Sequence, residues 1–227
     1  MFKKFNAVLR YSQRSESTQF NVTAMGYGGR WNATDQIPRR GVASGYVSRL
    51  GAIDPSDGGE SHRFSLSGAL QHYTRLGTTR INLYTLHTNL ALFSNFTYFL
   101  DDPVNGDQFS QTDKRFQSAL NISHIWDHKL AGIDTENEIG VQVQNDVIDN
   151  GLLSTRQRQT LSITRRDHIN QNSIGLYFQN STQWLPKFRS VAGVRSDFYW
   201  FDVHSRQDEN SGQRYDSMTN PKLSLIF

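Results

Sequence analysis

The sequence predicts an all-β fold, specifically an antiparallel transmembrane β-barrel segment of about 8–10 long strands with short periplasmic turns and long external loops. Apolar and polar residues alternate along most of the chain, as they do on a strand with one apolar face and one polar face. Several alternating stretches exceed the roughly 5–6 residues of an ordinary strand. The connecting segments alternate between short and long, which is typical of an outer-membrane barrel.

The composition fits this fold better than it fits a disordered chain. Hydrophobic residues make up 36% of the 227 residues, and the mean hydropathy is −0.60. The chain nevertheless contains 14 Phe, 9 Tyr, 4 Trp and 17 Gly. Disordered chains are poor in aromatic residues, whereas a transmembrane barrel needs an apolar residue only at every second strand position.

Charge and residue types argue against several functional classes. The 24 basic and 21 acidic residues are well mixed and form no basic stripe, so we expect no nucleic-acid partner. Without cysteine the chain has no thiolate chemistry and no cysteine-based metal site. No spacing supports a Ser-His-Asp arrangement, so we expect no enzyme and no cofactor. No run of about 18 apolar residues predicts a transmembrane helix.

The first three strands are predicted in the N-terminal third of the chain. Phe5–Tyr11 is the first of them. The second centres on Phe20, Val22 and Ala24, with polar residues between them. The third lies within Arg63–Tyr73 and places these residues on its apolar face: Phe64, Leu66, Gly68 and Leu70.

The fourth strand is predicted to be longer, from Tyr84 to Tyr98. At roughly 3.3 Å per residue and a tilt of about 40°, this length spans roughly 35 Å, so the two tyrosines are expected at opposite aromatic girdles. Leu90 is expected to face the bilayer and Asn89 the lumen. The predicted apolar face consists of Tyr84, Leu86, Thr88, Leu90, Leu92, Ser94, Phe96 and Tyr98.

Five further strands with the same alternation bring the expected number to about nine. Their apolar faces carry, in chain order, Phe116, Leu120, Ile122 and Trp126; Ile139, Val141, Val143 and Val147; Ile174, Leu176 and Phe178; Ala192, Val194, Phe198 and Trp200; and Leu223, Leu225 and Phe227.

The connections fall into two sets, which places the short ones at the periplasmic end and the long ones outside the cell. Short connections are predicted near Arg14–Ser17, Leu76–Thr78, Ala131–Asp134 and Leu185–Lys187, and long ones near Thr34–Glu60, Asp101–Asp113, Gly151–Asp167 and Gln207–Gln213.

Both ends of the chain suggest how much of a protein it represents. The N-terminal Met-Phe-Lys-Lys-Phe-Asn lacks the apolar core of a signal peptide, so we expect an excerpt, a fragment or a truncated gene product. Phe227 follows an alternating strand, as the last aromatic residue of many outer-membrane proteins does. A small stand-alone outer-membrane barrel with a structural or adhesive role is therefore the alternative. A soluble β-sandwich would also alternate, but with shorter strands.

Several stretches resemble the barrel portion of the TonB-dependent receptors of Gram-negative outer membranes. They fall in order across nearly the whole chain, and together they are more specific than any one of them alone. They are Leu9–Gln13, Trp31–Pro38, Gly51–Gly59 leading into Arg63–Gly68, Ala192–Tyr199 and Asn220–Phe227.

The resemblance implies that residues 1–227 are part of one barrel domain, without the plug domain. In the family this barrel has about 22 strands and a plugged lumen. Such receptors take up scarce solutes, usually ferric siderophores and sometimes cobalamin, nickel complexes or carbohydrates. The implied location is the cell outer membrane. The implied partners are outer-membrane lipid, the remaining strands and plug of the full receptor, and the TonB complex through an N-terminal part that this sequence lacks. Alone, the segment is not expected to function.

Candidate ligand contacts lie in the first long loop, where aromatic and basic residues are combined. Guanidinium groups can grip the carboxylates of an anionic siderophore in a fork. The alternatives are contact with lipopolysaccharide phosphates and ordinary solvation. The candidates are Trp31, Arg39, Arg40, Tyr46 and Arg49.

Metal sites find less support in the sequence. Asp54, Asp57 and Glu60 could offer oxygen ligands to calcium, although Asp-Gly is also ordinary turn chemistry. His124 and His128 would be about 13 Å apart on a strand, too far for one ion. Four charged side chains are expected to face the lumen and to pair with one another or with a plug: Arg63, Arg80, Glu138 and Arg195.

Overall fold

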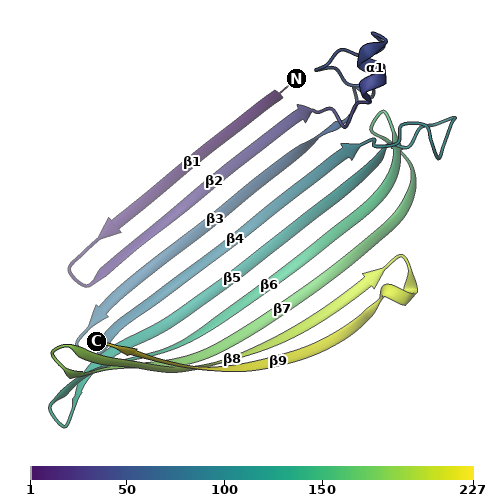
Figure 1. Ribbon diagram of the computed structural model, residues 1–227. Coiled ribbons are helices and arrows are strands. Elements are labelled where there is room, and N and C mark those ends of the chain that lie inside the picture. Colours follow the sequence, from purple (N-terminus) through teal and green to yellow (C-terminus); the bar gives the residue numbers. More distant parts are fainter. Residues whose placement is uncertain (1) are drawn as a thin grey trace.

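The computed structural model describes residues 2–227 as one antiparallel sheet in which each of nine strands pairs with its neighbours in sequence (Figure 1). The strands are β1 (Phe2–Arg14), β2 (Thr18–Asn32), β3 (Gly58–Thr74), β4 (Gly77–Ser94), β5 (Phe109–Leu130), β6 (Ile133–Arg156), β7 (Gln159–Leu185), β8 (Phe188–Ser205) and β9 (Gly212–Ile226).

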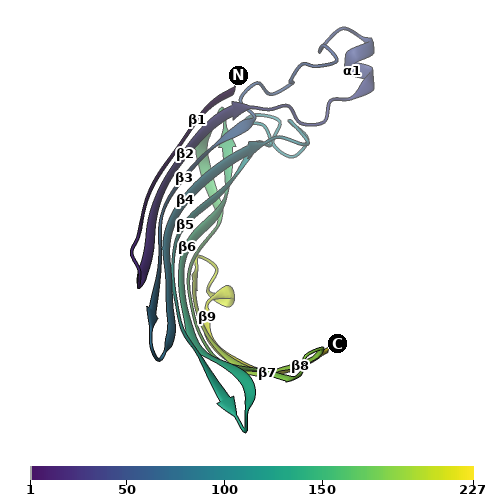
Figure 2. The same cartoon turned by 90° about the vertical axis from the view of Figure 1, so that its left-hand side faces the viewer.

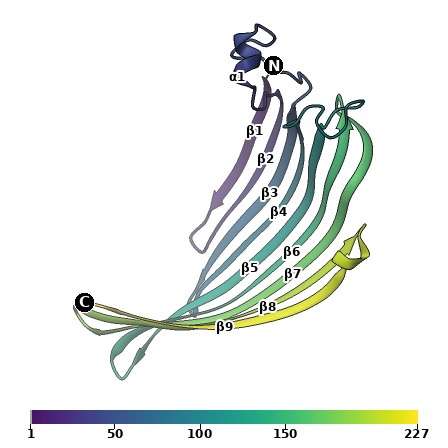
Figure 3. The same cartoon turned by 45° about the vertical axis from the view of Figure 1, so that its right-hand side comes forward.

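The sheet is strongly curved and open. Figure 2 shows it from the side as an arc that turns from β1 round to β9, and Figure 3 shows the strands running obliquely along the same arc. β1 and β9 are the two edge strands. Only three hydrophobic side chains are buried among the described residues, namely Val47, Ile148 and Leu153. The sheet therefore has no second layer packed on either face, as expected for a barrel wall with lipid on one side.

The connections at one end of the sheet are short and those at the other end are mostly long. Residues 15–17, 75–76, 131–132 and 186–187 form the short turns, which confirms all four predicted short connections. Residues 33–57, 95–108 and 206–211 form longer loops. The loops hold a helix, α1 (Arg39–Ala43), and a 3-10 turn, η1 (Asp208–Asn210). In the part of the chain that the structure describes, no helix is long and apolar enough to cross a membrane.

The strand register separates an apolar face from a polar face, because residues directly opposite one another share a face. One register row joins Gly68, Leu83, Leu120, Val143, Ile174 and Phe198 across six strands. The adjacent row on the other face joins Ala69, Asn82, Asn121, Gln142 and Gly175. In transmembrane barrels the apolar face is the outer one and the polar face lines the lumen, and the two faces are named accordingly below.

For β4, the prediction of which side chains lie on the outer face is wrong. Leu90 lies opposite Ser61 and Asp113 on the luminal face, whereas Asn89 lies opposite His62 and Lys114 on the outer face. The reason is that β4 carries apolar residues on both faces. Ile81 and Leu83 occupy the outer face within the membrane, and the leucines further along occupy the luminal face, so the longest leucine pattern indicated the wrong side. The luminal face also holds Tyr84, Leu86 and Leu92.

The predicted aromatic girdle of β4 is also wrong, because β4 ends at Ser94 and Tyr98 lies in the following loop. Tyr98 has a positive φ of 62°, which a strand residue does not adopt. Aromatic residues instead end the outward apolar band on other strands. Trp200 and Tyr215 lie opposite each other there, with ring centroids 5.7 Å apart.

The long loop predicted near Gly151–Asp167 is a hairpin. β6 and β7 continue to a two-residue turn, Gln157 and Arg158, with φ values of 50° and 66°. Turns of this kind usually contain Asn or Gly, so Gln-Arg gave no signal. The extended hairpin also has irregular register between Leu152 and Leu153 and between Ser154 and Thr155, which blurs the alternation.

Candidate functional site

A buried glutamine joins three separate segments at the external end. Gln108 is 2% exposed and immediately precedes β5. Its side-chain amide donates to Ser56 Oγ at 2.7 Å, to Asp57 Oδ1 at 3.1 Å and to Asp54 Oδ2 at 3.2 Å. Its carbonyl oxygen accepts from Thr155 Oγ1 at 3.1 Å and from the backbone N–H of Arg158 at 2.9 Å. Gln108 therefore ties the loop 33–57 to the tip of the β6–β7 hairpin.

Arg158 makes the second connection between the hairpin and this loop. Its Nε donates to the carbonyl oxygen of Ser56 at 2.7 Å, and its Nη2 donates to those of Trp31 at 3.2 Å and Asp57 at 3.3 Å. The guanidinium carbon lies 5.2 Å from the centre of the Phe93 ring, within cation–π range. One side chain thus bridges β6–β7, β4 and the loop before β3.

The two carboxylates that accept hydrogen bonds from Gln108, those of Asp54 and Asp57, differ in the direction of their pKa shift. Burial raises the pKa of Asp57 to about 7, and the neighbouring carboxylates of Asp54 and Asp35 also favour its neutral form against the opposing hydrogen bond from Gln108. Burial also opposes ionisation of Asp54, but hydrogen bonds from Ser56 and Asn95 outweigh it and lower the pKa of that carboxyl. We shall call Asp35, Asp54, Asp57, Gln108 and Arg158 the external cluster.

The loop 95–108 is fixed to the same cluster. Asn95 donates from its backbone to Asp35 Oδ2 at 2.8 Å and from its side chain to Asp54 Oδ2 at 2.9 Å. Tyr98 Oη donates to the carbonyl oxygen of Gln36 at 2.7 Å. The external cluster therefore holds both long loops in defined positions relative to the strands.

The five predicted ligand-contact residues lie in or next to the loop 33–57. Trp31 is the second-last residue of β2, and its ring lies over Gly59, where an added Cβ would be 2.7 Å from a ring carbon. Arg39 and Arg40 form the start of α1, and Arg49 is exposed further along the loop. Tyr46 is 77% exposed. Among the described residues, no hydrogen bond joins these five side chains to one another, so the structure places four of them on one loop and Trp31 on the strand before it, without a closed pocket.

The three carboxylates of the calcium hypothesis do not come together. Asp54 and Asp57 belong to the external cluster, whereas Glu60 lies on β3 opposite Arg30 and Ala91. Across residues 2–227, no group of three or more His, Asp or Glu side chains is arranged to hold a metal ion. Sequence reasoning missed Gln108 and Arg158, because their partners lie 47 to 127 residues away.

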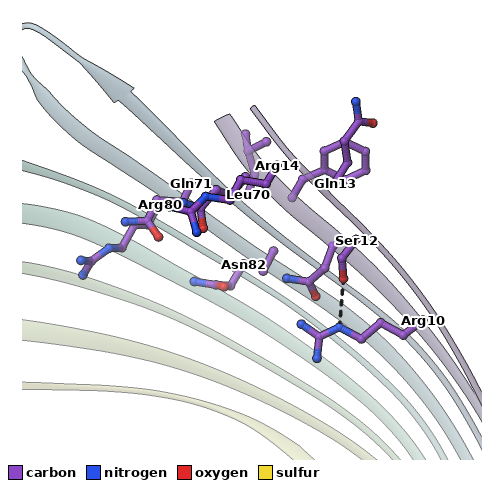
Figure 4. A pocket seen from close by; sticks show the side chains of 12 residues that line it. Arg10, Ser12, Gln13, Arg14, Leu70, Gln71, Arg80 and Asn82 are labelled. Carbon is purple, nitrogen blue, oxygen red and sulfur yellow. Dashed lines mark hydrogen bonds between the residues drawn. The ribbon is translucent and has the colours of Figure 1, made fainter. Parts of the chain in front are cut away.

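The luminal face carries an arginine-rich hollow of about 320 Å³ near the short-turn end of β1–β4 (Figure 4). Arg10 and Arg14 come from β1 and Arg80 from β4, and the other lining residues are neutral. Arg10 Nε donates to Ser12 Oγ at 3.2 Å. None of the ion pairs found in the described chain includes these three arginines. This hollow suits an anionic group.

A second luminal hollow, of about 420 Å³, is lined mainly by amides, hydroxyls and tyrosines. At its border Arg195 forms an ion pair with Asp197, with 2.6 Å between Nη2 and Oδ1. Tyr177 Oη donates to Glu138 at 3.2 Å. The four charged residues predicted to face the lumen, Arg63, Arg80, Glu138 and Arg195, all lie on the luminal face in the register.

Comparison with known proteins gives one family match. Residues 3–227 match the family described as TonB dependent receptor-like, beta-barrel. No curated protein matches the chain.

Similar solved structures are also barrels of this kind. The unliganded ferric citrate transporter FecA has a TM-score of 0.77 at 12% identity, and the match covers 99% of this chain and 33% of FecA. The copper transporter OprC has a TM-score of 0.69 at 13% identity, with 98% and 33% covered. The alcaligin outer-membrane receptor FauA from Bordetella pertussis has a TM-score of 0.65 at 10% identity, with 99% and 32% covered. At these identities the likeness is one of fold, and the chain spans about a third of each structure.

Proposed function

The chain belongs to the TonB-dependent receptor-like β-barrel family, and we propose that it forms part of the wall of a receptor that takes up scarce solutes, such as ferric siderophores or similar nutrients. The family places this wall in the outer membrane, which agrees with the apolar outer face. The alternative of a small stand-alone barrel is not favoured, because the matched structures are large receptors and transporters.

The observation that carries the proposal is that an external loop with several arginines is fixed in position next to a polar lumen. The loop 33–57 presents Arg39, Arg40 and Arg49, and the external cluster fixes the base of that loop. Pre-positioned guanidinium groups suit carboxylates of an anionic chelate, since less ordering is needed on binding. The arginine-rich hollow offers the same chemistry further along the lumen.

The remaining parts of the machinery belong to this proposal as well. Further strands would close the barrel at the edges of β1 and β9, a plug domain would occupy the lumen, and the TonB complex would supply energy through an N-terminal segment. Residues 1–227 would contribute wall alone. The proposed role involves binding and passage of solute without catalysis, in keeping with similar structures that are named as receptors or transporters.

Uptake by the full-length receptor tests the proposal. Cells without their own ferric citrate and hydroxamate receptors would express it and be supplied with radioactive iron as ferric citrate or as a ferric hydroxamate siderophore. We expect TonB-dependent uptake of at least one chelate. Arg39→Gln, Arg40→Gln and Arg49→Gln together should raise its KM roughly tenfold, through loss of charge-assisted hydrogen bonds.

The matched control removes three positive charges from the opposite end of the wall, at Lys129, Lys187 and Arg189. This control should leave KM within about twofold of the wild-type value, because surface charges far from the ligand are screened. TonB-independent uptake, absence of uptake, or equal KM changes in both triple variants would contradict the proposal.

A further inference from the structure

Two histidines face each other across the external ends of β7 and β8. His168 lies directly opposite His204 in the register, and both residues belong to the outer face. Their Cβ atoms are therefore about 4.5–5.5 Å apart. Among the described strands, this is the only place where two histidines are direct cross-strand neighbours. Because the two residues come from different strands, their spacing in the sequence does not indicate that they meet.

Each of the two imidazole rings has a carboxylate beside one of its nitrogens. His168 Nδ1 lies 2.7 Å from Asp149 Oδ1, and His204 Nε2 lies 3.4 Å from Asp202 Oδ1. An ionised carboxylate can only accept a hydrogen bond, so in the neutral rings these two nitrogens carry the proton. The other nitrogens, Nε2 of His168 and Nδ1 of His204, are then left with a lone pair each. Histidines that bind metal ions almost always have this arrangement, in which an oxygen acceptor behind the ring fixes its tautomer.

Both rings are free to turn toward each other. The side chains of His168 and His204 are 49% and 71% exposed, so packing holds neither ring in a single orientation. A transition-metal ion lies about 2.0–2.1 Å from each imidazole nitrogen, which requires the two nitrogens to be roughly 3–4 Å apart. Rings on directly opposed strand positions can meet this requirement by rotation of their side chains, without movement of the backbone.

Two imidazole nitrogens select the kind of ion that such a pair binds. Imidazole suits Cu²⁺, Ni²⁺ and Zn²⁺, whereas Ca²⁺ and Mg²⁺ prefer oxygen ligands. Among these divalent ions, Cu²⁺ binds nitrogen ligands most tightly. Across residues 2–227, no third His, Asp or Glu side chain is arranged around the same point. Water would therefore complete the coordination of the ion, and its binding would be reversible.

The histidine pair lies beyond the apolar band and in acidic surroundings. On β8, His204 follows the band-ending Trp200 by about 10 Å of height, at roughly 3.3 Å per residue and a tilt of about 40°. Asp149 and Asp202 bring two negative charges to the pair, and Lys114, opposite Asp149, offsets one of them. No ion pair within 4.0 Å joins Lys114 to Asp149 in the described chain. The site is thus open to water and keeps a net negative charge, which attracts a dication.

We propose that His168 and His204 together bind one transition-metal dication from the external medium, while Asp149 and Asp202 orient the two rings from behind. The ion would link β7 to β8 beyond the membrane. The proposal does not rest on the uptake of a chelate, because both histidines lie on the outer face of the wall and not in the lumen.

Copper binding by the full-length receptor tests this proposal. The receptor would be reconstituted into phosphatidylcholine vesicles and titrated with Cu²⁺ alone. The double variant His168→Gln, His204→Gln measures binding at all other sites, and the wild type should bind one Cu²⁺ more. Either single substitution should raise the Kd of that ion at least roughly tenfold. His62→Gln is the matched control, since His62 lies on the same face at the external end of β3 but opposite Gly28 and Asn89. This control should leave the Kd within about twofold of the wild-type value.

Spectroscopy of the bound Cu²⁺ separates a two-histidine site from binding to one exposed histidine. Electron spin-echo measurements count the imidazoles on the ion, and we expect two in the wild type and in His62→Gln but one in His168→Gln. Asp149→Asn should keep two imidazoles and bind Cu²⁺ roughly tenfold more weakly, because the acceptor behind the His168 ring loses its charge. A single imidazole on the wild-type copper, or a copper stoichiometry that the double variant does not lower, would overturn the proposal.

Discussion

Arg158 holds the tip of the β6–β7 hairpin against the loop before β3 with a single side chain. Its guanidinium donates to the carbonyl oxygens of Ser56, Trp31 and Asp57. Loss of charged hydrogen bonds leaves buried acceptors without partners, which costs more than the bonds contribute. Arg158→Ala should therefore release the loop 33–57.

Trypsin can measure this release, because the loop contains Arg39, Arg40 and Arg49. In the full-length receptor, Arg158→Ala should raise the rate of cleavage at these sites roughly tenfold, the factor expected from about 1.4 kcal/mol. Arg156 is the control, since its one side-chain hydrogen bond, to Asn105, is 3.4 Å long. Equal cleavage of the Arg156→Ala and Arg158→Ala variants would contradict the role assigned to Arg158.

Asp57 should make the same loop sensitive to pH. Its pKa is about 7 in the folded cluster against an ordinary value of 3.8. A raised carboxyl pKa means that the neutral form fits the folded site. The stability that protonation provides is therefore present at acidic pH and is lost as the pH rises from about 4 through about 7.

Hydrogen exchange of the loop 33–57 at pH 5 and pH 8, corrected for intrinsic exchange rates, checks this prediction. Protection of the wild type should fall at least roughly tenfold between these pH values. Asp57→Asn keeps the shape without the titration and should show protection that is independent of pH. Asp54 does not interfere, because its pKa is lowered and it stays ionised throughout this window. Wild-type protection that rises with pH would contradict the assignment.

Residue-scale contacts of this kind could not be predicted from the sequence. Gln108 and Arg158 lie in segments with no motif, and the Gln157–Arg158 turn uses residues that rarely adopt positive φ. The loop containing Arg39 to Arg49 could be predicted, because its polar composition interrupts the alternation. Its attachment to the rest of the molecule depends on side chains more than 100 residues away.

At the scale of elements, β4 shows what decides which side chains of a strand lie on the outer face. Leu83 lies on the outer face near the middle of the apolar band and is 48% exposed, whereas Leu90 lies on the luminal face opposite Ser61 and Asp113. Leu83→Arg in the intact barrel should lower the free energy of unfolding in lipid by about 2–4 kcal/mol. Leu90→Arg should lower it by less than about 1 kcal/mol, because the luminal face is polar. A larger cost for Leu90→Arg than for Leu83→Arg would indicate that Leu90 lies on the outer face, as the leucine pattern predicted.

A turn glycine gives a second test at this scale. Gly77 has a φ of 134°, and an added Cβ would lie 2.1 Å from the backbone oxygen of Ile125. Gly132 also has a positive φ, 83°, but nothing lies within 4 Å of an added Cβ. Gly132→Ala should cost about 1 kcal/mol, from conformation alone. Gly77→Ala should cost roughly 2–3 kcal/mol, since backbone must also move. Equal unfolding free energies for the two variants would contradict the close approach.

Elements were largely predictable because alternation is a local property of a strand. Ile139, Val141 and Val143 on β6 indicate their face without reference to any neighbour. The prediction for β4 was wrong because the face on which its side chains lie depends on the register with β3 and β5, which the strand itself does not encode. The outer part of the β6–β7 hairpin was predicted as a loop for a related reason, since bulges near Leu152 and Ser154 interrupt the alternation of apolar and polar residues there.

At the scale of the whole molecule, the sheet is a curved wall with different surroundings on its two faces. Large apolar side chains such as Phe64, Leu176 and Phe178 are exposed on the outer face. Asn, Gln and Arg side chains occupy the luminal face around Asn121 and Gln142. In water such an apolar surface would be unusually large for a monomer, and in a bilayer it is the surface that lipid requires. The location in the membrane thus follows from the same alternation that produces the strands.

The most direct test of this account is a quenching scan along β3 and β4 of the full-length receptor in vesicles. The chain has no cysteine of its own, so single cysteines can be introduced at Leu66, Ser67, Leu83 and Tyr84 and labelled with a fluorophore. Lipid-borne quenchers should quench the labels at Leu66 and Leu83, and they should leave those at Ser67 and Tyr84 bright. Equal quenching at all four positions, or quenching only by a water-soluble agent, would contradict a membrane barrel wall with this register.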